Sequence, residues 1–151
     1  SAGAHLLILY ASILTNREYA STYDFKAPEG FHFNALALNC GVYNITSESE
    51  LTGALMKEYL PLGGLEEEFK EIDPKQYITS DFPPCFVMTA EGDFLIEDAL
   101  TMSQVLTHCN VPHMYKYYVG DQPLNHVFHC NIRLKEAIQC NDEECEFFKT
   151  Y

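Results

Sequence analysis

Stretches of apolar residues with two different periods divide the chain into predicted helices and strands. Residues 2–15 are apolar on nearly every side, which predicts a helix packed between a sheet and other elements. Short apolar runs predict a strand over 34–40 that is buried on both sides and a second strand over 85–90. A third, Tyr-rich strand is expected over 113–119. Leu95, Ala99, Met102 and Leu106 recur at helical spacing, so a helix is expected over 95–108.

Residues 45–81 have a different composition and predict a helical insertion that resembles a cap. Ser47 and Glu50 form a capping-box pattern, and Leu51, Leu55 and Tyr59 follow at helical spacing. A second short amphipathic helix is expected over 65–72, where the acidic residues form a solvated face.

The pattern ends with a helix expected over 128–139 and an acidic amphipathic tail at 141–151. The alternation of helices and strands is typical of an α/β protein, and right-handed crossovers make the strands parallel. No repeat, low-complexity tract or dividing linker is present. The sequence therefore predicts one α/β domain, 1–151, with about three parallel strands, flanking helices and the insertion at 45–81.

Composition and charge exclude several classes of partner. The 151 residues are 47% hydrophobic, enough for a sizeable core, and carry a formal net charge of −13. A strongly acidic protein is a poor partner for nucleic acid or an anionic membrane surface. The longest strongly apolar run, 6–14, is too short to cross a bilayer. No signal peptide is visible, and a cytoplasmic location is expected.

The six cysteines predict neither a disulfide framework nor a metal centre. They are scattered in apolar segments without the spacing of a small disulfide-rich scaffold, so we expect reduced thiols that pack as small hydrophobes. His126, His129 and Cys130 cluster in sequence, but no C-x₂-C pair accompanies them. We therefore expect no metal and no cofactor.

Three residues that can perform nucleophilic catalysis stand at the expected strand exits. Ser1 opens the first helix, Asp93 leaves 85–90, and His126 follows 113–119. In a parallel α/β sheet, functional groups gather beyond the carboxyl ends of the strands. The chain order Ser, Asp, His is that of an α/β-hydrolase triad, in which an imidazole takes the serine proton and a buried carboxylate orients the imidazole.

The motifs around these residues resemble hormone-sensitive-lipase-like α/β-hydrolases. The segment from Pro83 to Leu95 is similar to the family's segment that bears the catalytic acid. His126-Val-Phe128 resembles the family's catalytic-histidine motif, and Ser1-Ala-Gly3 resembles the end of its nucleophile elbow. The resemblance covers nearly the whole chain but only the carboxyl-terminal half of the family's domain.

The resemblance implies a hydrolase of carboxylic esters that acts on a small-molecule substrate without a cofactor. Ser1 would be the nucleophile, Asp93 the acid, His126 the base and the Ala2 N–H an oxyanion donor. Phe94 stands where the family usually has proline, and the family's upstream His-Gly-Gly motif is not in the sequence. We therefore expect little activity from this stretch alone, and a homo-oligomer that forms through an exposed sheet edge or face.

Several alternatives remain open at the level of the sequence. Asp93 could merely cap the following helix, with Asp98 or Glu91 as the acid, and His129 competes with His126. His5 is expected to be structural. A peptidase or amidase would use the same triad, and a non-catalytic interaction module could retain it as a relic.

Overall fold

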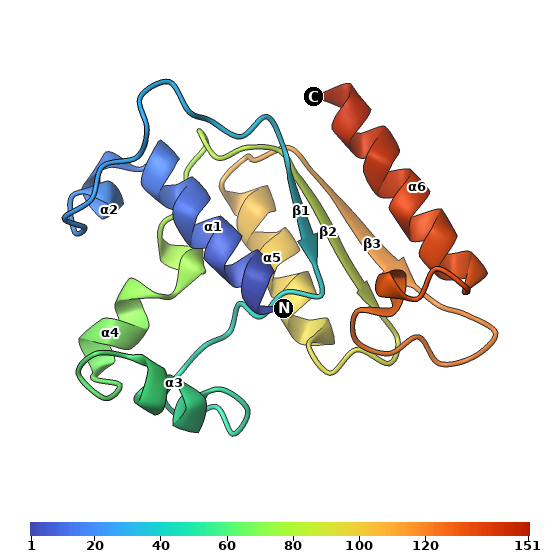
Figure 1. The fold of residues 1–151 in the computed structure, drawn as a ribbon, viewed down its shortest axis with the longest axis horizontal. Helices are drawn as coiled ribbons and strands as arrows, with labels where there is room; N and C mark the ends of the chain where they lie inside the picture. The colour runs from blue at the N-terminus through green and yellow to red at the C-terminus, as the bar shows by residue number, and fades with distance from the viewer.

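The computed structural model describes residues 1–151 and has a parallel three-stranded sheet between two layers of helices (Figure 1). The strands are β1 (Leu36–Asn39), β2 (Cys85–Ala90) and β3 (His113–Tyr118), in the order β1-β2-β3. All six residues of β2 are buried, because this central strand has neighbours on both sides and helices on both faces. The predicted α/β fold with a parallel sheet is confirmed.

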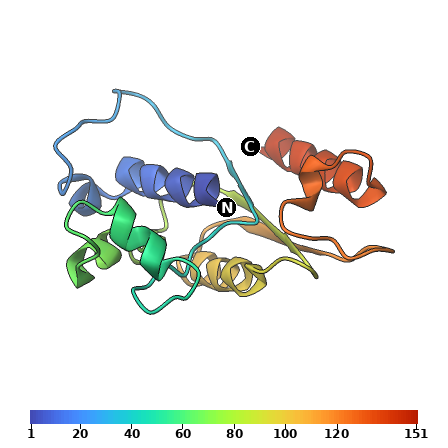
Figure 2. The same ribbon diagram turned by 60° about the horizontal axis from the view of Figure 1, so that its bottom comes forward.

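One face of the sheet is covered by α1 (Ala2–Thr15) and α5 (Ile96–His108), and the other by α6 (Lys135–Thr150) (Figure 2). Successive residues of a strand point to opposite faces, so β2 contributes to two separate cores. Cys85 and Val87 pack with α1 and α5, whereas Phe86 and Met88 pack with α6. No helix combines the length and apolar character that crossing a bilayer requires.

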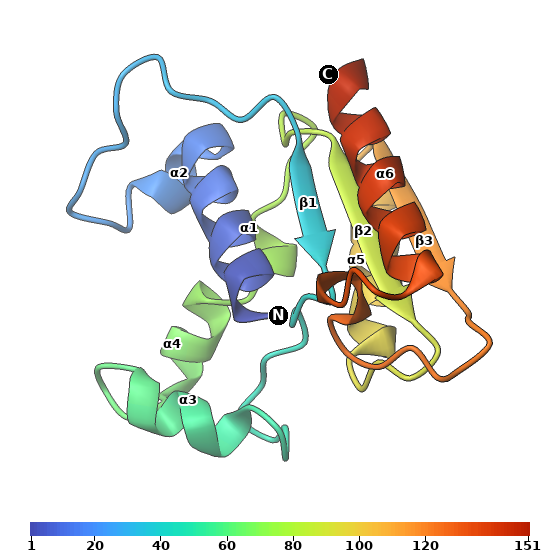
Figure 3. The same ribbon diagram turned by 45° about the vertical axis from the view of Figure 1, so that its right-hand side comes forward.

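A short helix, α2 (Arg17–Ala20), follows α1 and precedes β1. The insertion between β1 and β2 contains α3 (Gly53–Tyr59), α4 (Glu66–Glu71) and a 3₁₀ turn at Pro74–Gln76. Figure 3 shows α3 and α4 away from the sheet, beyond the first turn of α1. The buried Glu68 carboxylate accepts the N–H groups of Leu62, Gly64 and Leu65, and these bonds hold the α3–α4 connection.

The predicted start of α3 is wrong, and so is its predicted apolar stripe. The helix begins at Gly53, and a side-chain Cβ at this position would lie 2.5 Å from the Ser47 carbonyl oxygen. The chain therefore turns back on itself over 47–52 instead of entering a helix at the capping-box pattern. Leu51, Leu55 and Tyr59 are each more than half exposed. Leu51 and Leu55 line a pocket beside the amino end of α1 instead of a packed core.

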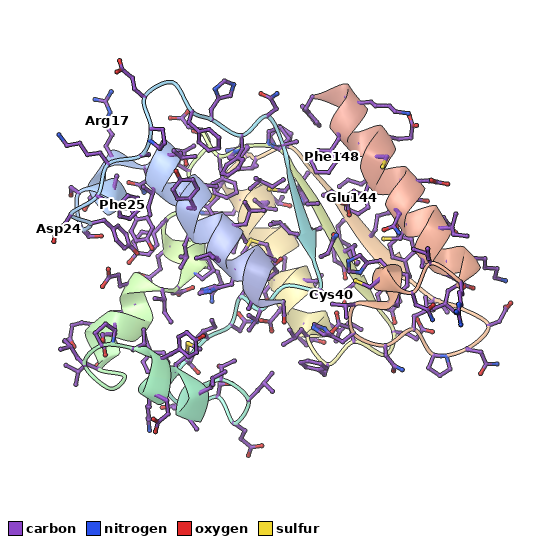
Figure 4. The ribbon with its side chains drawn as sticks, viewed as in Figure 1. Arg17, Asp24, Phe25, Cys40, Glu144 and Phe148 are labelled. Carbon is purple, nitrogen blue, oxygen red and sulfur yellow. The ribbon has the colours of Figure 1, made fainter.

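The carboxyl-terminal prediction also needs correction. Phe128–Cys130 is only a 3₁₀ turn, and α6 begins at Lys135 and continues through the predicted tail to Thr150. Phe147 is buried against Phe86, with ring centroids 5.8 Å apart, so the tail contributes to the core. Glu144 also accepts a hydrogen bond from Asn39 Nδ2 at 2.7 Å, and Figure 4 shows Glu144 on the side of α6 nearest β1.

Candidate active site

Asp93 and His126 form a hydrogen-bonded pair at the carboxyl end of the sheet. His126 Nδ1 lies 2.8 Å from Asp93 Oδ1, and the Asp93 side chain is 0% exposed while that of His126 is 18% exposed. The other ring nitrogen, Nε2, has no hydrogen-bond partner within the protein. A buried carboxylate therefore orients an imidazole whose second nitrogen is free to accept a proton.

Hydrogen bonds keep the Asp93 carboxylate ionised. Burial by itself raises the pKa of Asp93, but the donors around the carboxylate outweigh this effect and hold the pKa below its ordinary value. The Leu95 N–H donates to Oδ1 and the Thr89 hydroxyl to Oδ2, both at 2.9 Å. The Cys40 thiol and His126 contribute in the same direction.

We expect Thr89→Val to destabilise the protein by about 1.5–3 kcal/mol near pH 7, since it removes a hydrogen bond to a buried charged group. Thr89 is fully buried, and valine has nearly the same shape. The folded-state pKa of Asp93 is depressed, so the stability that its ionised form contributes is present above the unfolded pKa and is lost as the pH falls through the folded pKa. The difference from the parent protein should therefore shrink in acid. Urea unfolding at a series of pH values measures it, and a pH-independent difference would contradict this explanation.

The loop that carries His126 is anchored to the turn that carries Asp93. Glu91 Oε1 accepts the N–H groups of Gly120 and Leu124, both at 3.2 Å, and the Gly92 N–H donates to the Leu124 carbonyl at 3.0 Å. Gly92 also forms a parallel bridge with Asn125, the residue before His126. Glu91, an alternative acid in the sequence, thus binds loop backbone and makes no hydrogen bond to His126.

Two strained positions meet beside this pair. Cys40, which follows β1, and Val127, which follows His126, have left-handed φ values of 48° and 56°. Such values are unusual for a side chain with a Cβ and rarer for a β-branched residue. The Val127 N–H donates to Cys40 Sγ at 3.4 Å. This contact joins the exit of β1, where Figure 4 labels Cys40, to the segment that holds His126.

Cys40 is the site residue that sequence reasoning missed. Its Sγ lies in a cluster with Asp93 and His126 in which one donor atom from each residue is within 4.8 Å of the others. Burial raises the pKa of the Cys40 thiol to about 12, so the sulfur is protonated at neutral pH. Its position at the end of the 34–40 run could have identified it as a site residue, because neighbouring parallel strands end at the same edge of the sheet.

Ser1 lies near this pair without a hydrogen bond to it. Its carbonyl accepts the His5 N–H at 3.2 Å and so begins α1, while its exposed hydroxyl has no hydrogen-bond partner. Figure 3 shows the amino terminus beside the carboxyl end of β1. Ser1 and Ala2 line a pocket of about 250 Å³ together with Phe94, and the Phe94 ring centroid is 4.4 Å from that of His126. The structure thus brings Asp93 and His126 together and places Ser1 in the pocket that Phe94, the ring beside His126, also lines.

The other candidate residues have structural contacts. The buried Asp98 carboxylate accepts the N–H groups of Tyr43 and Asn44 and the Asn44 side-chain amide. His5 Nε2 lies 2.8 Å from the Ile72 carbonyl oxygen. His129 Nδ1 is buried without a partner, and burial lowers the pKa of this imidazole. Neither Asp98 nor His129 makes a hydrogen bond to the Asp93–His126 pair.

All six cysteines are free, as expected for reduced thiols, although Cys130 and Cys145 are exposed and do not pack in the core.

Solved structures share this fold, although no family model and no curated protein matches the sequence. Esterase B from Lactobacillus rhamnosis superposes with a TM-score of 0.83 at 24% identity, over 99% of this chain and 51% of that one. A putative carboxylesterase from Lactobacillus plantarum gives a TM-score of 0.70 at 19% identity, over 99% and 54% of the two chains.

A match of lower sequence identity is a hydrolase with two activities. An acetyl ester-xyloside bifunctional hydrolase from Caldicellulosiruptor lactoaceticus gives a TM-score of 0.73 at 14% identity, over 99% of this chain and 54% of that one. The chain spans about half the length of the solved structures it matches. It has the fold of a partial α/β-hydrolase, which confirms the resemblance found in the sequence at the level of the fold.

Proposed function

We propose that this chain is the carboxyl-terminal half of a serine hydrolase of carboxylic esters. The observation that carries the proposal is the Asp93–His126 hydrogen bond of 2.8 Å at the sheet edge where α1 begins with Ser1. The esterases that share the fold support the reaction class.

The proposed mechanism uses each residue for one task. His126 Nε2 removes the proton of the Ser1 hydroxyl while Oγ bonds to the acyl carbon, and Asp93 stabilises the imidazolium that forms. The imidazolium then donates that proton to the departing alcohol. Water then attacks the acyl carbon while the same imidazole takes its proton, and the imidazolium returns that proton to Ser1 Oγ as the bond to the serine breaks and the acid is released. The Ala2 N–H is the one oxyanion donor that we assign within the chain, and a second donor would come from another part of the domain.

The pocket beside Ser1 suits an apolar group of the substrate. Its lining comes from the first turn of α1, from the segment between Val42 and Met56, and from Phe94 and Leu95. Eight of the eleven lining residues are hydrophobic, and the exposed Leu55 of α3 is one of them. We therefore assign the insertion a role in forming the wall of the acyl or alcohol site. A triad alone does not distinguish an ester from an amide, so both substrate types belong in the test.

A fluorophosphonate probe, which reacts with activated serines, tests this proposal against a non-catalytic module. The protein should carry this chain together with the remaining half of the fold. We expect labelling that Ser1→Ala removes and that the exposed control Ser21→Ala leaves unchanged. The labelled protein should also hydrolyse p-nitrophenyl acetate. This ester hydrolysis should be faster than any hydrolysis of the matching anilide. A completed domain that is neither labelled nor active would identify an interaction module instead.

The 151-residue chain alone should hydrolyse esters little above background. Ser1 has no hydrogen bond to His126, no preceding strand holds its turn, and the terminal amine adds charge and freedom of motion. The comparison is p-nitrophenyl acetate turnover by the chain and by its Ser1→Ala variant. A difference above about 10³-fold would contradict this expectation, because it would show a working site within the chain alone.

We further propose that the chain self-associates through the open edge of β1. β1 pairs on one side only, and the N–H groups of Leu36 and Cys40 donate to residues of the β2 segment. By the alternation of a parallel ladder, the N–H groups of Ala37 and Asn39 point to the open edge. On neighbouring α1, Leu6 is 68% exposed. Unpaired edges of this kind recruit other chains.

Light scattering at micromolar concentration should detect a dimer or a larger oligomer. Ala37→Pro removes one edge donor without touching the β2 ladder and should shift the population toward monomer. Leu62→Ala, which shortens an exposed side chain in the insertion, is the control. A monodisperse monomer in the parent protein would contradict the proposal.

A further inference from the structure

The cluster of Cys40, Asp93 and His126 has the composition of a metal site as well as that of a catalytic pair. It offers one sulfur, one carboxylate oxygen and one imidazole nitrogen, all within 4.8 Å of one another. The three residues follow β1, β2 and β3, and the contacts of Glu91 and Gly92 with the loop after β3 hold His126 beside the other two. The proposed ester hydrolysis assigns no step to the sulfur, which in this structure accepts the Val127 N–H.

These donors match the preferences of Zn²⁺, which binds thiolate sulfur, imidazole nitrogen and carboxylate oxygen in tetrahedral sites. With metal–ligand bonds of about 2.0–2.3 Å, two donors of such a site lie about 3.5 Å apart. Separations near the 4.8 Å limit therefore have to shorten by about 1.3 Å, and the 2.8 Å between Asp93 Oδ1 and His126 Nδ1 has to lengthen by about 0.7 Å. His126 supplies this adjustment most readily, because its side chain is the partly exposed member of the three.

The surroundings also favour a soft divalent ion over a hard one. Cys40 Sγ lies 3.7 Å from the buried Met88 Sδ, which places a second polarisable atom beside the thiol. Thr89 donates to Asp93 Oδ2 at 2.9 Å, and this bond leaves Oδ1 as the carboxylate oxygen that faces His126. Carboxylates that bind a metal are typically hydrogen-bonded by an outer residue in this way, here by Thr89.

We propose that Cys40, Asp93 and His126 form an inhibitory Zn²⁺ site, in which the metal takes the place of the proton between Asp93 Oδ1 and His126 Nδ1. The Cys40 thiol releases its proton to solvent and becomes the thiolate ligand. The imidazole binds through Nδ1 and keeps its one proton on Nε2, so the site releases one proton in total. Water completes the tetrahedron on the exposed side of His126.

Occupancy by zinc is incompatible with the proposed catalytic role of the same residues. An imidazole that holds its proton on Nε2 and its metal on Nδ1 accepts no proton from Ser1. Zinc binding itself does not depend on the proposed function, but inhibition by zinc does. The metal site is therefore tested by direct binding on the 151-residue chain, and inhibition is a second measurement on the completed domain.

The binding experiment needs a background without exposed thiols. Cys130 and Cys145 are exposed, and Cys130 Sγ lies 3.7 Å from His129 Nε2, so both cysteines are replaced by serine in every protein compared. Zn²⁺ is titrated in competition with a chromophoric chelator. We expect one equivalent to bind, with an affinity that falls at least about tenfold in Cys40→Ala and in His126→Ala. Cys85→Ala is the matched control, since it removes an equally buried thiol that packs on the opposite face of the sheet.

Cd²⁺ provides a readout that reports the sulfur directly. The thiolate-to-cadmium charge-transfer absorption should appear in the background protein and in Cys85→Ala and be lost in Cys40→Ala. Circular dichroism tests whether each variant is folded. If Cys40→Ala does not fold, the zinc affinity of His126→Ala decides whether the cluster is the binding site. Absence of zinc binding in the background protein would overturn the proposal, as would equal binding by all variants. Ester hydrolysis without zinc binding refutes this inference alone, whereas zinc binding without serine reactivity refutes the proposed function alone.

Discussion

Replacing Asp93 by asparagine should lower the turnover of short acyl esters by about 10⁴-fold in a protein that completes the domain around this chain. Asp93 Oδ1 accepts a hydrogen bond from His126 Nδ1 at 2.8 Å, and an ionised carboxylate in that place keeps the proton on Nδ1 and Nε2 free. An asparagine amide can hold the opposite tautomer and does not stabilise the imidazolium. His126→Ala should have a similarly large effect because it removes the base itself.

The controls for this prediction are the neighbouring carboxylates. Glu91→Gln retains an oxygen that can accept the Gly120 and Leu124 N–H groups, and Asp98→Asn changes a carboxylate that is not bonded to His126. Both variants should keep most of the turnover, which p-nitrophenyl ester hydrolysis measures at saturating substrate. A harmless Asp93→Asn together with a damaging Asp98→Asn would show that the acid is assigned to the wrong residue.

Asp98→Ala should destabilise the chain by about 3 kcal/mol or more, the largest stability change that we expect from a single side chain outside the Asp93–His126 pair. The carboxylate accepts the N–H groups of Tyr43 and Asn44, and the Asn44 amide donates to it at 3.0 Å. Alanine would leave these donors without a partner in a buried region. The free energy of unfolding in urea measures the change.

Glu97→Ala is the matched control for Asp98→Ala, because Glu97 is the preceding residue of α5 and its side chain is exposed. Its effect should stay within about 0.5 kcal/mol. Asp98→Ala should lower the urea midpoint and leave the m-value unchanged. The lost stability would then belong to the hydrogen bonds between Asp98 of α5 and the segment after β1. An effect of Asp98→Ala as small as that of Glu97→Ala would refute this role for the buried carboxylate.

The hydrophobic pattern predicted the strands because each is a short apolar or aromatic run, and the central strand β2 is buried along its whole length. The run 85–90 coincides with β2, whose residues are all buried, and the prediction for 113–119 differs from β3 by one residue. α1 and α5 were likewise recognised from their apolar residues. These elements depend on local periodicity and on contact with a continuous core, which are properties that a sequence displays directly.

The same reasoning failed where a segment's structure depends on distant contacts. The pattern at 47–50 satisfies a capping box, but the close approach of the Ser47 carbonyl to Gly53 delays the helix. The acidic tail has low overall hydrophobicity, yet it is part of α6, which continues to Thr150. Phe147 of this helix packs against Phe86 on the face of the sheet that α6 covers. Neither contact partner can be identified from the local sequence.

Some features of the candidate site could likewise be predicted from the sequence, and others depend on the tertiary structure. The sequence by itself determined that an acidic residue and a histidine follow successive buried strands, and the parallel arrangement of those strands brings their ends together. Only the tertiary structure decided that Asp93 binds His126, that Asp98 and Glu91 bind backbone N–H groups, and that Cys40 completes the cluster. The physical reason is that strand order and register set which side chains are adjacent across a sheet. Adjacency at that scale is a property of pairing between segments that are far apart in the chain.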